Sequence, residues 1–476
     1  MNSAQSLRFL NAMRALLGAS QVLDQAAELA PHATDWRSRY HGKPLALALP
    51  ADTAQVAEVV QLCAAHGVPI VPQGGNTGLV GGATPDASGS QLLLSLKRLN
   101  RIRDLSAADG VLVAEAGCIL QNVQDAAQQA GLLFPLSLAA EGSATIGGVL
   151  STNAGGTAVL RYGNARALCL GLEVVTPQGE VWNGLSALRK DNTGYDLRDL
   201  YIGAEGTLGI ITAASLQLFA QPVAQCTALV LVAHAQDAVD LLQDARASLG
   251  AGLTAFELMS THSLQLVQRH FPQLRLPLEL RTPWCVLLEL SDNESEAHAQ
   301  ARLEVVLGAA LQHDRVIDVA VAQSLAQAQG MWALREHIPL AQAQEGLNIK
   351  HDIAVPISHM AAFVESTAEL VTQALPGARL VVFGHLGDGN LHYNVQAPIA
   401  SDAAQFLAEH QETCNRIVHD AAAACGGSFS AEHGVGQLKT EELQRYKSPV
   451  ALGLMRAIKA ALDPLGLMNP GKVIRP

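Results

Sequence analysis

Hydrophobic residues recur at regular intervals along the chain, and their period predicts where helices and strands lie. A helix is predicted within residues 50–67, because Asp52 or Thr53 can cap its start and Gly67 can end it. Its apolar stripe is Val56, Val59, Val60 and Cys63. A second helix is predicted at 122–131.

Residues 1–18 also have a helical period and predict an amphipathic helix of the fold, because no apolar leader segment is present. The apolar face of this helix is Leu7, Leu10, Met13, Leu16 and Leu17. Short apolar runs predict strands at 68–71, 91–96 and 111–117. Pro177 to Gly179 predict the turn of a hairpin within 170–182.

The amino-acid composition of the sequence changes after about residue 222. Glycine becomes sparse, and alanine-rich helical segments alternate with the predicted strands 226–234 and 284–290. This pattern predicts a separate α+β domain built on its own sheet. Residues 420–436 are again rich in small side chains, and the chain ends in a helix followed by an extended tail.

Composition narrows the class of protein. A chain of 476 residues with 49% hydrophobic and 16% charged residues predicts an enzyme-like protein of two or three domains. The net charge of −12, with no Lys/Arg cluster, argues against nucleic acid as a partner. No apolar run approaches the roughly 20 residues that a transmembrane helix needs. Seven scattered cysteines without a CxxC pair indicate reduced thiols and a cytoplasmic protein.

Three glycine-rich segments are the first candidates for chemistry. They are 72–82, 141–163 and 201–212, and five glycines fall within 74–82 alone. Glycine lets backbone N–H groups approach an anion closely, so two such loops after strands suit a dinucleotide pyrophosphate. The alternative is turn-rich loops without a ligand. The nicotinamide pattern GxGxxG and the P-loop pattern are both absent from these loops.

Residues 379–396 are predicted to form a β-hairpin around a two-residue turn at Asp388-Gly389. In that register His385 lies directly across from His392, where cross-strand Cβ atoms are roughly 4.5–5.5 Å apart. Two imidazoles in this arrangement can bind one metal ion. Asn394 shares the face of His392. Solvated or core histidines are the alternative.

A third metal ligand is available in the segment AEHG. Glu432 and its neighbour His433 point apart in an extended chain, so we assign Glu432 to the metal and His433 to proton transfer. Two histidines and one carboxylate leave open positions on Zn²⁺ or a similar ion, which is typical of a catalytic site.

Two basic residues are candidates for binding a substrate carboxylate. Arg335 offers a planar fork, and Lys350 lies on a predicted strand opposite the apolar side chains of Leu347, Ile349, Ile353 and Val355. Taken alone, each of the two is as well explained as a surface charge.

These motifs, in this order, resemble the FAD-linked D-2-hydroxyacid dehydrogenases of the vanillyl-alcohol oxidase/p-cresol methylhydroxylase superfamily, and most closely their D-2-hydroxyglutarate branch. The resemblance covers nearly the whole chain and depends on DWRSRYHG, PQGGNTGLVGG, GSATIGGVLSTNAGG, GAEGTLGIIT, GHLGDGNLHYN, SAEHGVG and NPGK. It implies an α+β fold with a two-subdomain FAD-binding domain (1–221), a substrate and metal domain with an antiparallel sheet (222–425) and a C-terminal segment (426–476) that returns to the FAD domain.

The resemblance implies that FAD lies extended, with its pyrophosphate on the glycine loops. FAD is expected to be non-covalent, because Asn76 replaces the histidine that some members bond to flavin. The residues expected to bind it are Pro72, Gly74, Gly75, Asn76, Thr77, Gly78, Gly142, Ser143, Thr145, Ile146, Gly148, Asn153, Gly155, Gly206 and Ile211.

The resemblance also assigns roles in the active site. It implies metal ligands His385, His392 and Glu432, the catalytic base His433, and substrate contacts Arg335, Lys350, Asn394 and His433. One departure concerns Pro339, which stands four residues after Arg335 where that branch has threonine. A carboxylate contact is lost there, so D-malate or D-lactate gains weight against the five-carbon diacid.

The implied reaction is oxidation of D-2-hydroxyglutarate or D-malate to the 2-oxo acid, with hydride transfer to flavin assisted by a divalent metal, expected to be zinc. The alternatives are a D-lactate or glycolate-type dehydrogenase and a flavin-binding subunit of a larger complex. Electron-transfer flavoprotein, a quinone or a cytochrome could accept the electrons. A homodimer is common in the family, and the sequence does not decide this point.

Overall fold

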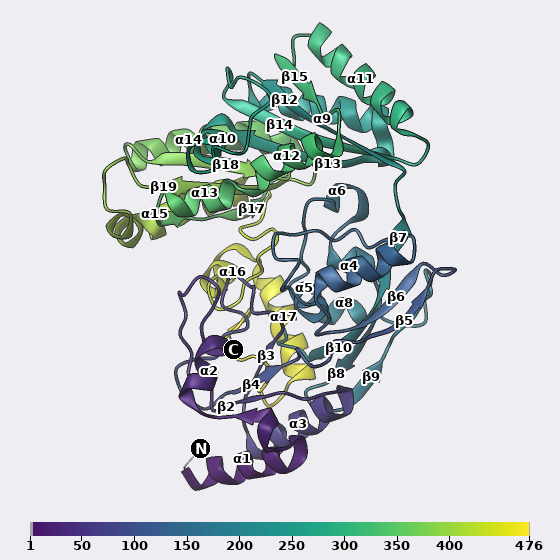
Figure 1. Cartoon of the computed structure of the whole chain (residues 1–476). Helices are drawn as coiled ribbons and strands as arrows, with labels where there is room; N and C mark the ends of the chain where they lie inside the picture. Colours follow the sequence, from purple (N-terminus) through teal and green to yellow (C-terminus); the bar gives the residue numbers. More distant parts are fainter. Residues whose placement is uncertain (1–2, 476) are drawn as a thin grey trace. The chain divides into compact units, whose positions relative to one another are not determined.

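The structure is a computed structural model that describes residues 3–475. Contacts divide it into two compact units. Unit 1 contains Met1–Gly156, Gly163–Gln221 and Glu432–Pro476, and unit 2 contains Thr157–Tyr162 and Pro222–Ala431. The elements of each unit can be followed by their labels in Figure 1.

The first sheet of unit 1 has four strands in the order β1-β2-β4-β3, with β4 parallel to both β2 and β3. These are β1 (Val22–Leu23), β2 (Ala46–Ala48), β3 (Ile70–Gln73) and β4 (Leu92–Ser95). The helix α3 (Thr53–His66) precedes β3. Asp52 caps α3 by accepting from the Gln55 N–H, and Gly67 ends it with φ 64°. The predicted stripe of α3 is buried.

The second sheet of unit 1 has five strands and is antiparallel, in the order β5-β6-β10-β8-β9. These are β5 (Ile102–Ser106), β6 (Val111–Glu115), β8 (Cys169–Val175), β9 (Val181–Asn183) and β10 (Ile210–Gln217). The predicted hairpin is confirmed, with Val175 opposite Val181. The strands β7 (Leu132–Leu133) and β11 (Phe219–Ala220) form a separate two-stranded antiparallel sheet.

The remaining helices of unit 1 are short apart from the two at its ends. They are α1 (Ser3–Leu17), η1 (Ala19–Gln21), α2 (Ala26–Ala33), α4 (Leu120–Gln129), α5 (Ile146–Ser151), α7 (Ala165–Leu168), α8 (Arg198–Tyr201), α16 (Thr440–Tyr446) and α17 (Pro449–Leu462). The C-terminal segment joins the first sheet, because Met468 forms a β-bridge with Ile70 and the Asn469 side chain donates to the carbonyl groups of Gly82 and Glu205.

Unit 2 is built on an eight-stranded sheet in the order β15-β12-β14-β13-β18-β19-β16, with β17 also paired to β19. Every pairing is antiparallel. The strands are β12 (Ala224–Val232), β13 (Leu253–Ser260), β14 (Trp284–Asp292), β15 (Asp318–Val321), β16 (Asn348–Ile349), β17 (Asp352–Ala354), β18 (Arg379–Gly384) and β19 (Asn390–Gln396).

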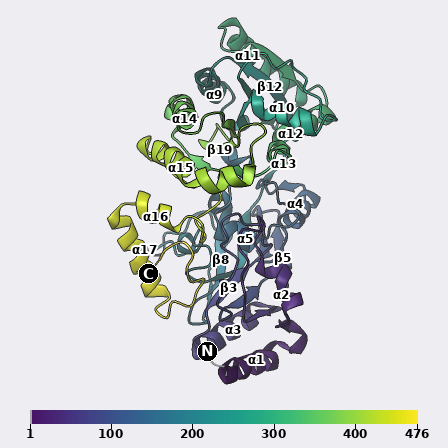
Figure 2. The same cartoon turned by 90° about the vertical axis from the view of Figure 1, so that its left-hand side faces the viewer.

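Helices cover both faces of this sheet, which explains why its strands are apolar on both sides. In Figure 2, α9 (Ala235–Leu249), α14 (Met360–Ala374) and α15 (Ala403–Ala424) lie on one side of β19, and α10 (Thr261–His270), α12 (Leu325–Glu336) and α13 (Ile338–Gln344) lie on the other. Two apolar cores result, one on each face. The other helices of unit 2 are α6 (Val159–Tyr162), η2 (Gly250–Gly252), α11 (Glu296–Gln312) and η3 (Ile357–His359).

Three local predictions need correction. Leu7 is 57% exposed, because α1 instead buries Phe9, Met13 and Leu17. The predicted strand 68–71 begins two residues later, because the Val68 N–H completes the end of α3 by bonding the Cys63 carbonyl.

The third correction concerns the strand that carries Lys350. It is interrupted at residues 350–351, where the backbone N–H of His351 donates to the Asn394 side chain. Leu347, expected on the apolar face, is 56% exposed, whereas Ile349, Ile353 and Val355 are buried.

Two global properties follow from the described residues. None of their helices combines the length and apolar character that crossing a membrane requires. All seven cysteines are free thiols, and every one except Cys425 is buried.

Candidate active site

A pocket of about 310 Å³ lies in unit 1. The end of β3 and the loop after it, residues 72–83, form one side of it, and the segment 138–156 around α5 forms another. The two loops pack backbone to backbone: a Cβ on Gly75 would lie 2.0 Å from the Ser143 carbonyl oxygen. Only glycine permits this approach, which explains the glycine density of both segments.

Backbone N–H groups that have no hydrogen-bond acceptor among the described residues lie in the loop after β3, whose residues line the pocket. Within the described part of the chain, the backbone N–H groups of residues 74–78 donate no hydrogen bond. The buried hydroxyl of Thr145, which also lines the pocket, has no partner there either. Successive N–H groups of this kind form an anion-binding concavity, so the residues present fit the pyrophosphate of a dinucleotide.

Ten of the fifteen residues expected to bind the cofactor line this pocket: Pro72, Gly74, Gly75, Asn76, Thr77, Gly78, Thr145, Gly148, Gly155 and Gly206. The other five are outside its lining: Gly142, Ser143, Ile146, Asn153 and Ile211. Their local structure explains the difference. The N–H groups of Ser143 and Ile146 bond the carbonyls of Ala140 and Cys118, and the Asn153 side chain accepts from the Arg166 N–H.

The AEHG segment contributes to the same pocket. Glu432 and His433 both line it, and a carboxylate oxygen of Glu432 accepts a 2.9 Å hydrogen bond from the Gly156 N–H. The pocket therefore brings the predicted base His433 to the glycine loops of unit 1.

Glu205 is a pocket residue that lies within the GAEGTLGIIT motif but was given no role in the sequence analysis. It has a left-handed backbone (φ 51°) and accepts hydrogen bonds from the N–H groups of Val435 (2.7 Å) and Gly436 (2.8 Å). Burial raises the pKa of Glu205 to about 7, although these two N–H groups and two lysines act in the opposite direction. Its carboxylate fixes the turn that follows His433.

The hairpin that carries the two histidines is real, but its predicted register is wrong. His392 pairs with Phe383 instead of His385, and residues 385–389 form a longer turn. Long-range contacts override the local Asp-Gly preference: the Gly387 N–H donates to the carbonyl of Phe256 on β13, and His385 bonds Glu257 on the same strand.

The two imidazoles nevertheless lie together in unit 2. Their ring centroids are 6.2 Å apart. Because side chains alternate with a period of two, a register shift of two residues leaves His392 on the face of the sheet that the predicted register gave it. The pair therefore offers the nitrogen ligands of a metal site without the cross-strand pairing that predicted it.

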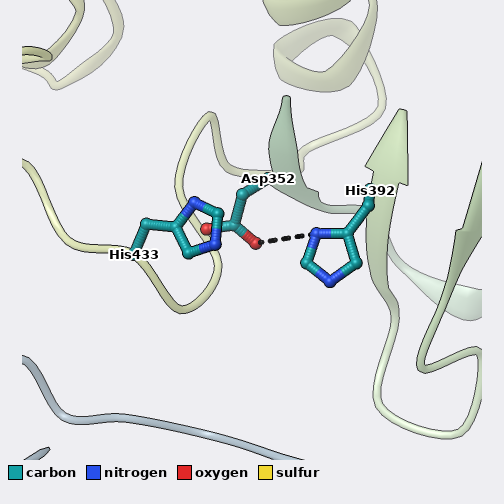
Figure 3. Close-up of side chains that lie close together, drawn as sticks. All are labelled: Asp352, His392 and His433. Carbon is teal, nitrogen blue, oxygen red and sulfur yellow. Dashed lines mark ion pairs between the residues drawn. The ribbon is translucent and has the colours of Figure 1, made fainter. Parts of the chain in front are cut away.

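Asp352 is a further carboxylate beside this pair. It lies opposite His392 in the ladder, and its Oδ1 is 4.0 Å from the His392 Nδ1. Figure 3 marks this ion pair with a dashed line. Asp352 is buried and accepts hydrogen bonds from the Asn390 side chain (2.9 Å) and the Ala431 N–H (3.2 Å). Its position after Lys350 in an extended segment was the only signal in the sequence.

The predicted substrate contacts of unit 2 differ in their surroundings. Arg335 is buried on α12 and bonds Glu257, whereas Lys350 is exposed in the break between β16 and β17. Asn394 is buried, accepts from the His351 N–H and donates to the Gln342 side chain. Pro339 lies in the first turn of α13, where a missing N–H is tolerated.

Comparison with protein families agrees with this geometry. Residues 44–184 match the FAD binding domain, and residues 221–473 match the C-terminal domain of FAD linked oxidases. The mitochondrial D-2-hydroxyglutarate dehydrogenase of Arabidopsis thaliana is 37% identical over 461 residues, which cover 96% of this chain and 80% of the relative. The chain belongs to the D-2-hydroxyglutarate dehydrogenase family of FAD-linked oxidases.

Other relatives of the family extend the comparison. The D-2-hydroxyglutarate dehydrogenase of Xanthomonas citri pv. viticola is 40% identical over 457 residues, covering 96% of this chain and 94% of the relative. Among solved structures, p-cresol methylhydroxylase with substrate bound matches with a TM-score of 0.78 at 17% identity, covering 100% of this chain and 98% of that chain. The expected fold is thereby confirmed: an FAD-binding domain of the p-cresol methylhydroxylase type and a second α+β domain.

Proposed function

We propose that this protein oxidises the C2 hydroxyl of a D-2-hydroxy acid, D-2-hydroxyglutarate or D-malate, to the 2-oxo acid. The observation that carries the proposal is the 36–40% identity to D-2-hydroxyglutarate dehydrogenases over nearly the whole chain. The proposal assigns the glycine-lined pocket to the cofactor, unit 1 to cofactor binding and unit 2 to substrate and metal.

FAD, when bound, supplies the acceptor for the C2 hydride. The unused N–H groups of residues 74–78 support its pyrophosphate in this pocket. Asn76 lacks a nucleophilic atom for a flavin bond, and its amide donates to the Thr34 carbonyl, so we propose non-covalent binding.

A divalent metal, which we propose to be zinc, would lower the pKa of the substrate hydroxyl when bound by His385, His392 and Glu432. The two rings that lie 6.2 Å apart supply two imidazole ligands. Glu432 follows Ala431 directly, and Ala431 is hydrogen-bonded to Asp352 beside His392. The Cα of Glu432 is therefore about 3.8 Å from the Cα of Ala431, the residue that is hydrogen-bonded beside His392.

The chain's own groups move the proton and hold the substrate. His433 accepts the proton of the 2-hydroxyl as general base. Arg335 neutralises a carboxylate: its Nε donates to Glu257, and its two terminal nitrogens donate no hydrogen bond within the described residues. Lys350 and Asn394 complete the proposed contacts. Orientation of C2 by such groups is worth several kcal/mol.

Pro339 affects the choice of substrate. It has no hydroxyl to offer a distal carboxylate, and it lies at the start of α13 directly after the helix that carries Arg335. This favours D-malate over the longer diacid. The monoacid D-lactate is the alternative. It needs only one cationic anchor, whereas this chain offers two, Arg335 and Lys350, which favours a diacid.

The proposal also covers the cellular setting. Electron-transfer flavoprotein or a quinone would reoxidise the enzyme, a homodimer is compatible with the family, and the free cysteines suit a cytoplasmic protein. The relative from Arabidopsis thaliana carries a mitochondrial designation, whereas the relative from Xanthomonas citri pv. viticola carries none.

The test is anaerobic mixing of the FAD-loaded protein with D-2-hydroxyglutarate, D-malate and D-lactate while flavin absorbance is followed. We expect rapid bleaching by a D-diacid that is lost on chelation and restored by Zn²⁺ or Mn²⁺. The L-enantiomers are the control. A protein that holds FAD and metal but is bleached by none of these acids would contradict the proposal.

A further inference from the structure

A carboxylate that none of the sequence motifs contains connects two proposed active-site residues. Glu257 lies on β13, between Phe256 and Leu258, and its side chain is almost completely buried. It points to the face of the sheet that α10, α12 and α13 cover, since its neighbour Met259 packs in that core. A buried charge there is unfavourable unless it is paired, so its partners explain its presence.

Each oxygen of Glu257 has one cationic or polar partner. The Nε–H of Arg335 donates to Oε2 at 2.6 Å, and the Nδ1 of His385 lies 2.5 Å from Oε1. Glu257 thus accepts on both oxygens from side chains of the proposed site, and the Arg335 guanidinium is the charged partner that its burial requires.

The contact with His385 determines which ring nitrogen can bind a metal. A carboxylate accepts from a proton donor only, so Nδ1 carries the hydrogen and Nε2 is the ring nitrogen that has the lone pair a metal ion needs. A carboxylate behind a ligating histidine also fixes the ring plane and raises its basicity.

The contact of Glu257 with Arg335 determines the orientation of the Arg335 guanidinium group. With Nε bound to Glu257 and the guanidinium stacked over Phe383 at 4.8 Å, the plane of the group is fixed from two sides. The terminal nitrogens of Arg335 have no hydrogen bond within the described residues. They are thus presented in one orientation to an incoming carboxylate.

We propose that Glu257 is a positioning residue that orders both the metal ligand His385 and the substrate anchor Arg335, so that one buried carboxylate couples metal binding to recognition of the substrate carboxylate. This inference rests on the proposed function, because it takes His385 as a ligand of that metal site. Glu257 itself touches neither metal nor substrate.

The test substitutes Glu257→Gln, which keeps the size but leaves one of the two donors without an acceptor. The probe is Zn²⁺ alone, titrated against a competing chelator into metal-stripped, FAD-loaded protein. We expect the Kd for Zn²⁺ to rise about 10–100-fold, the effect typical of a second partner behind a metal ligand. The KM for the D-hydroxy acid should rise by more than kcat falls, and the FAD content should not change.

Glu289→Gln is the matched control. Glu289 is a partly buried carboxylate of the neighbouring strand β14, but it bonds Trp332 and Thr227 instead of the histidine or the arginine. We expect its Zn²⁺ affinity to stay at the wild-type value. Equal weakening in both variants would mean a general structural effect and would overturn the proposal.

The variants His385→Ala and His392→Ala separate this inference from the proposed function. If neither lowers Zn²⁺ affinity, the metal site itself is wrong. If both lower it while folded Glu257→Gln binds Zn²⁺ normally, only the role of Glu257 is wrong. Should Glu257→Gln not fold, Glu257→Asp keeps the charge on a shorter stem, and normal Zn²⁺ binding by that variant would equally overturn the inference.

Discussion

The backbone N–H of Gly156 donates a 2.9 Å hydrogen bond to the carboxylate of Glu432, which is 276 positions later in the chain. The neighbouring glycine is equally close: a Cβ on Gly155 would lie 2.5 Å from the same carboxylate oxygen. The glycine segment of the cofactor pocket therefore sets the position of a proposed metal ligand.

A methyl group at Gly155 should displace that ligand. In Gly155→Ala the clash falls on the flexible end of the Glu432 side chain, so we expect the fold to persist while Zn²⁺ affinity drops at least about tenfold. Gly308→Ala, which meets no atom within 4 Å, is the control. Chelator competition measures the effect, and unchanged affinity in a folded variant would remove Glu432 from the ligand set.

A methyl group at Gly78 should interfere with the cofactor alone. A Cβ there meets no atom within 4 Å, so the protein without FAD should keep its thermal stability, yet Gly78 lines the pocket. We expect the Kd for FAD to rise about tenfold or more, since the methyl occupies the space beside the N–H groups. Gly453→Ala, on α17 and outside the pocket lining, also meets no atom within 4 Å and should bind FAD normally in fluorescence titrations; equal losses would contradict the pocket assignment.

The buried carboxylate of Glu205 should make stability fall as pH rises. Its folded-state pKa of about 7 exceeds the ordinary 4.5, so the folded protein binds more protons than the unfolded chain between these values. The stability lost across this window is roughly 3 kcal/mol. Thermal midpoints of Glu205→Gln, compared with wild type from pH 5 to 8, should depend less on pH.

The exposed Glu369→Gln is the control for this effect, because it removes a carboxylate that is not buried. Its pH profile should parallel that of the wild type. If Glu205→Gln also gave a parallel profile, the carboxylate of Glu205 would not titrate in this window.

Replacement of His433 should separate binding from chemistry. In His433→Ala we expect FAD to stay bound, because the glycine loops supply most of the pocket lining, while bleaching by the D-acid slows by about 10²–10⁴-fold. Stopped-flow absorbance under anaerobic conditions measures the rate. Bleaching at the wild-type rate would assign the base to another residue.

Local sequence was sufficient for much of the fold. The caps of α3 and its buried stripe follow from side-chain chemistry within a few residues, and so does the β8–β9 hairpin. The hairpin with His385 and His392 shows the limit. Its turn follows contacts with Phe256 and Glu257, which lie more than a hundred positions earlier, so no local rule predicts its register.

The site was predictable where a residue type is rare or clustered, as with the paired histidines and the glycine loops. Glu257 and Asp352 were missed because each is a single acidic residue in a segment without a motif. Glu205 lies within GAEGTLGIIT, but only the glycines of that segment suggested a role. Their significance comes from burial and from partners far along the chain, which only the folded structure reveals.

The division of the chain has a consequence for biosynthesis. Unit 2 is almost one continuous stretch, whereas unit 1 needs the segment after Ala431, which the ribosome makes last. Unit 2 can therefore mature on the nascent chain, while the pocket of unit 1 lacks Glu432 and His433 until synthesis is nearly over. A chain that stops before the final 45 residues would have a complete unit 2 but an unfinished pocket in unit 1, so under the proposed function FAD would load late.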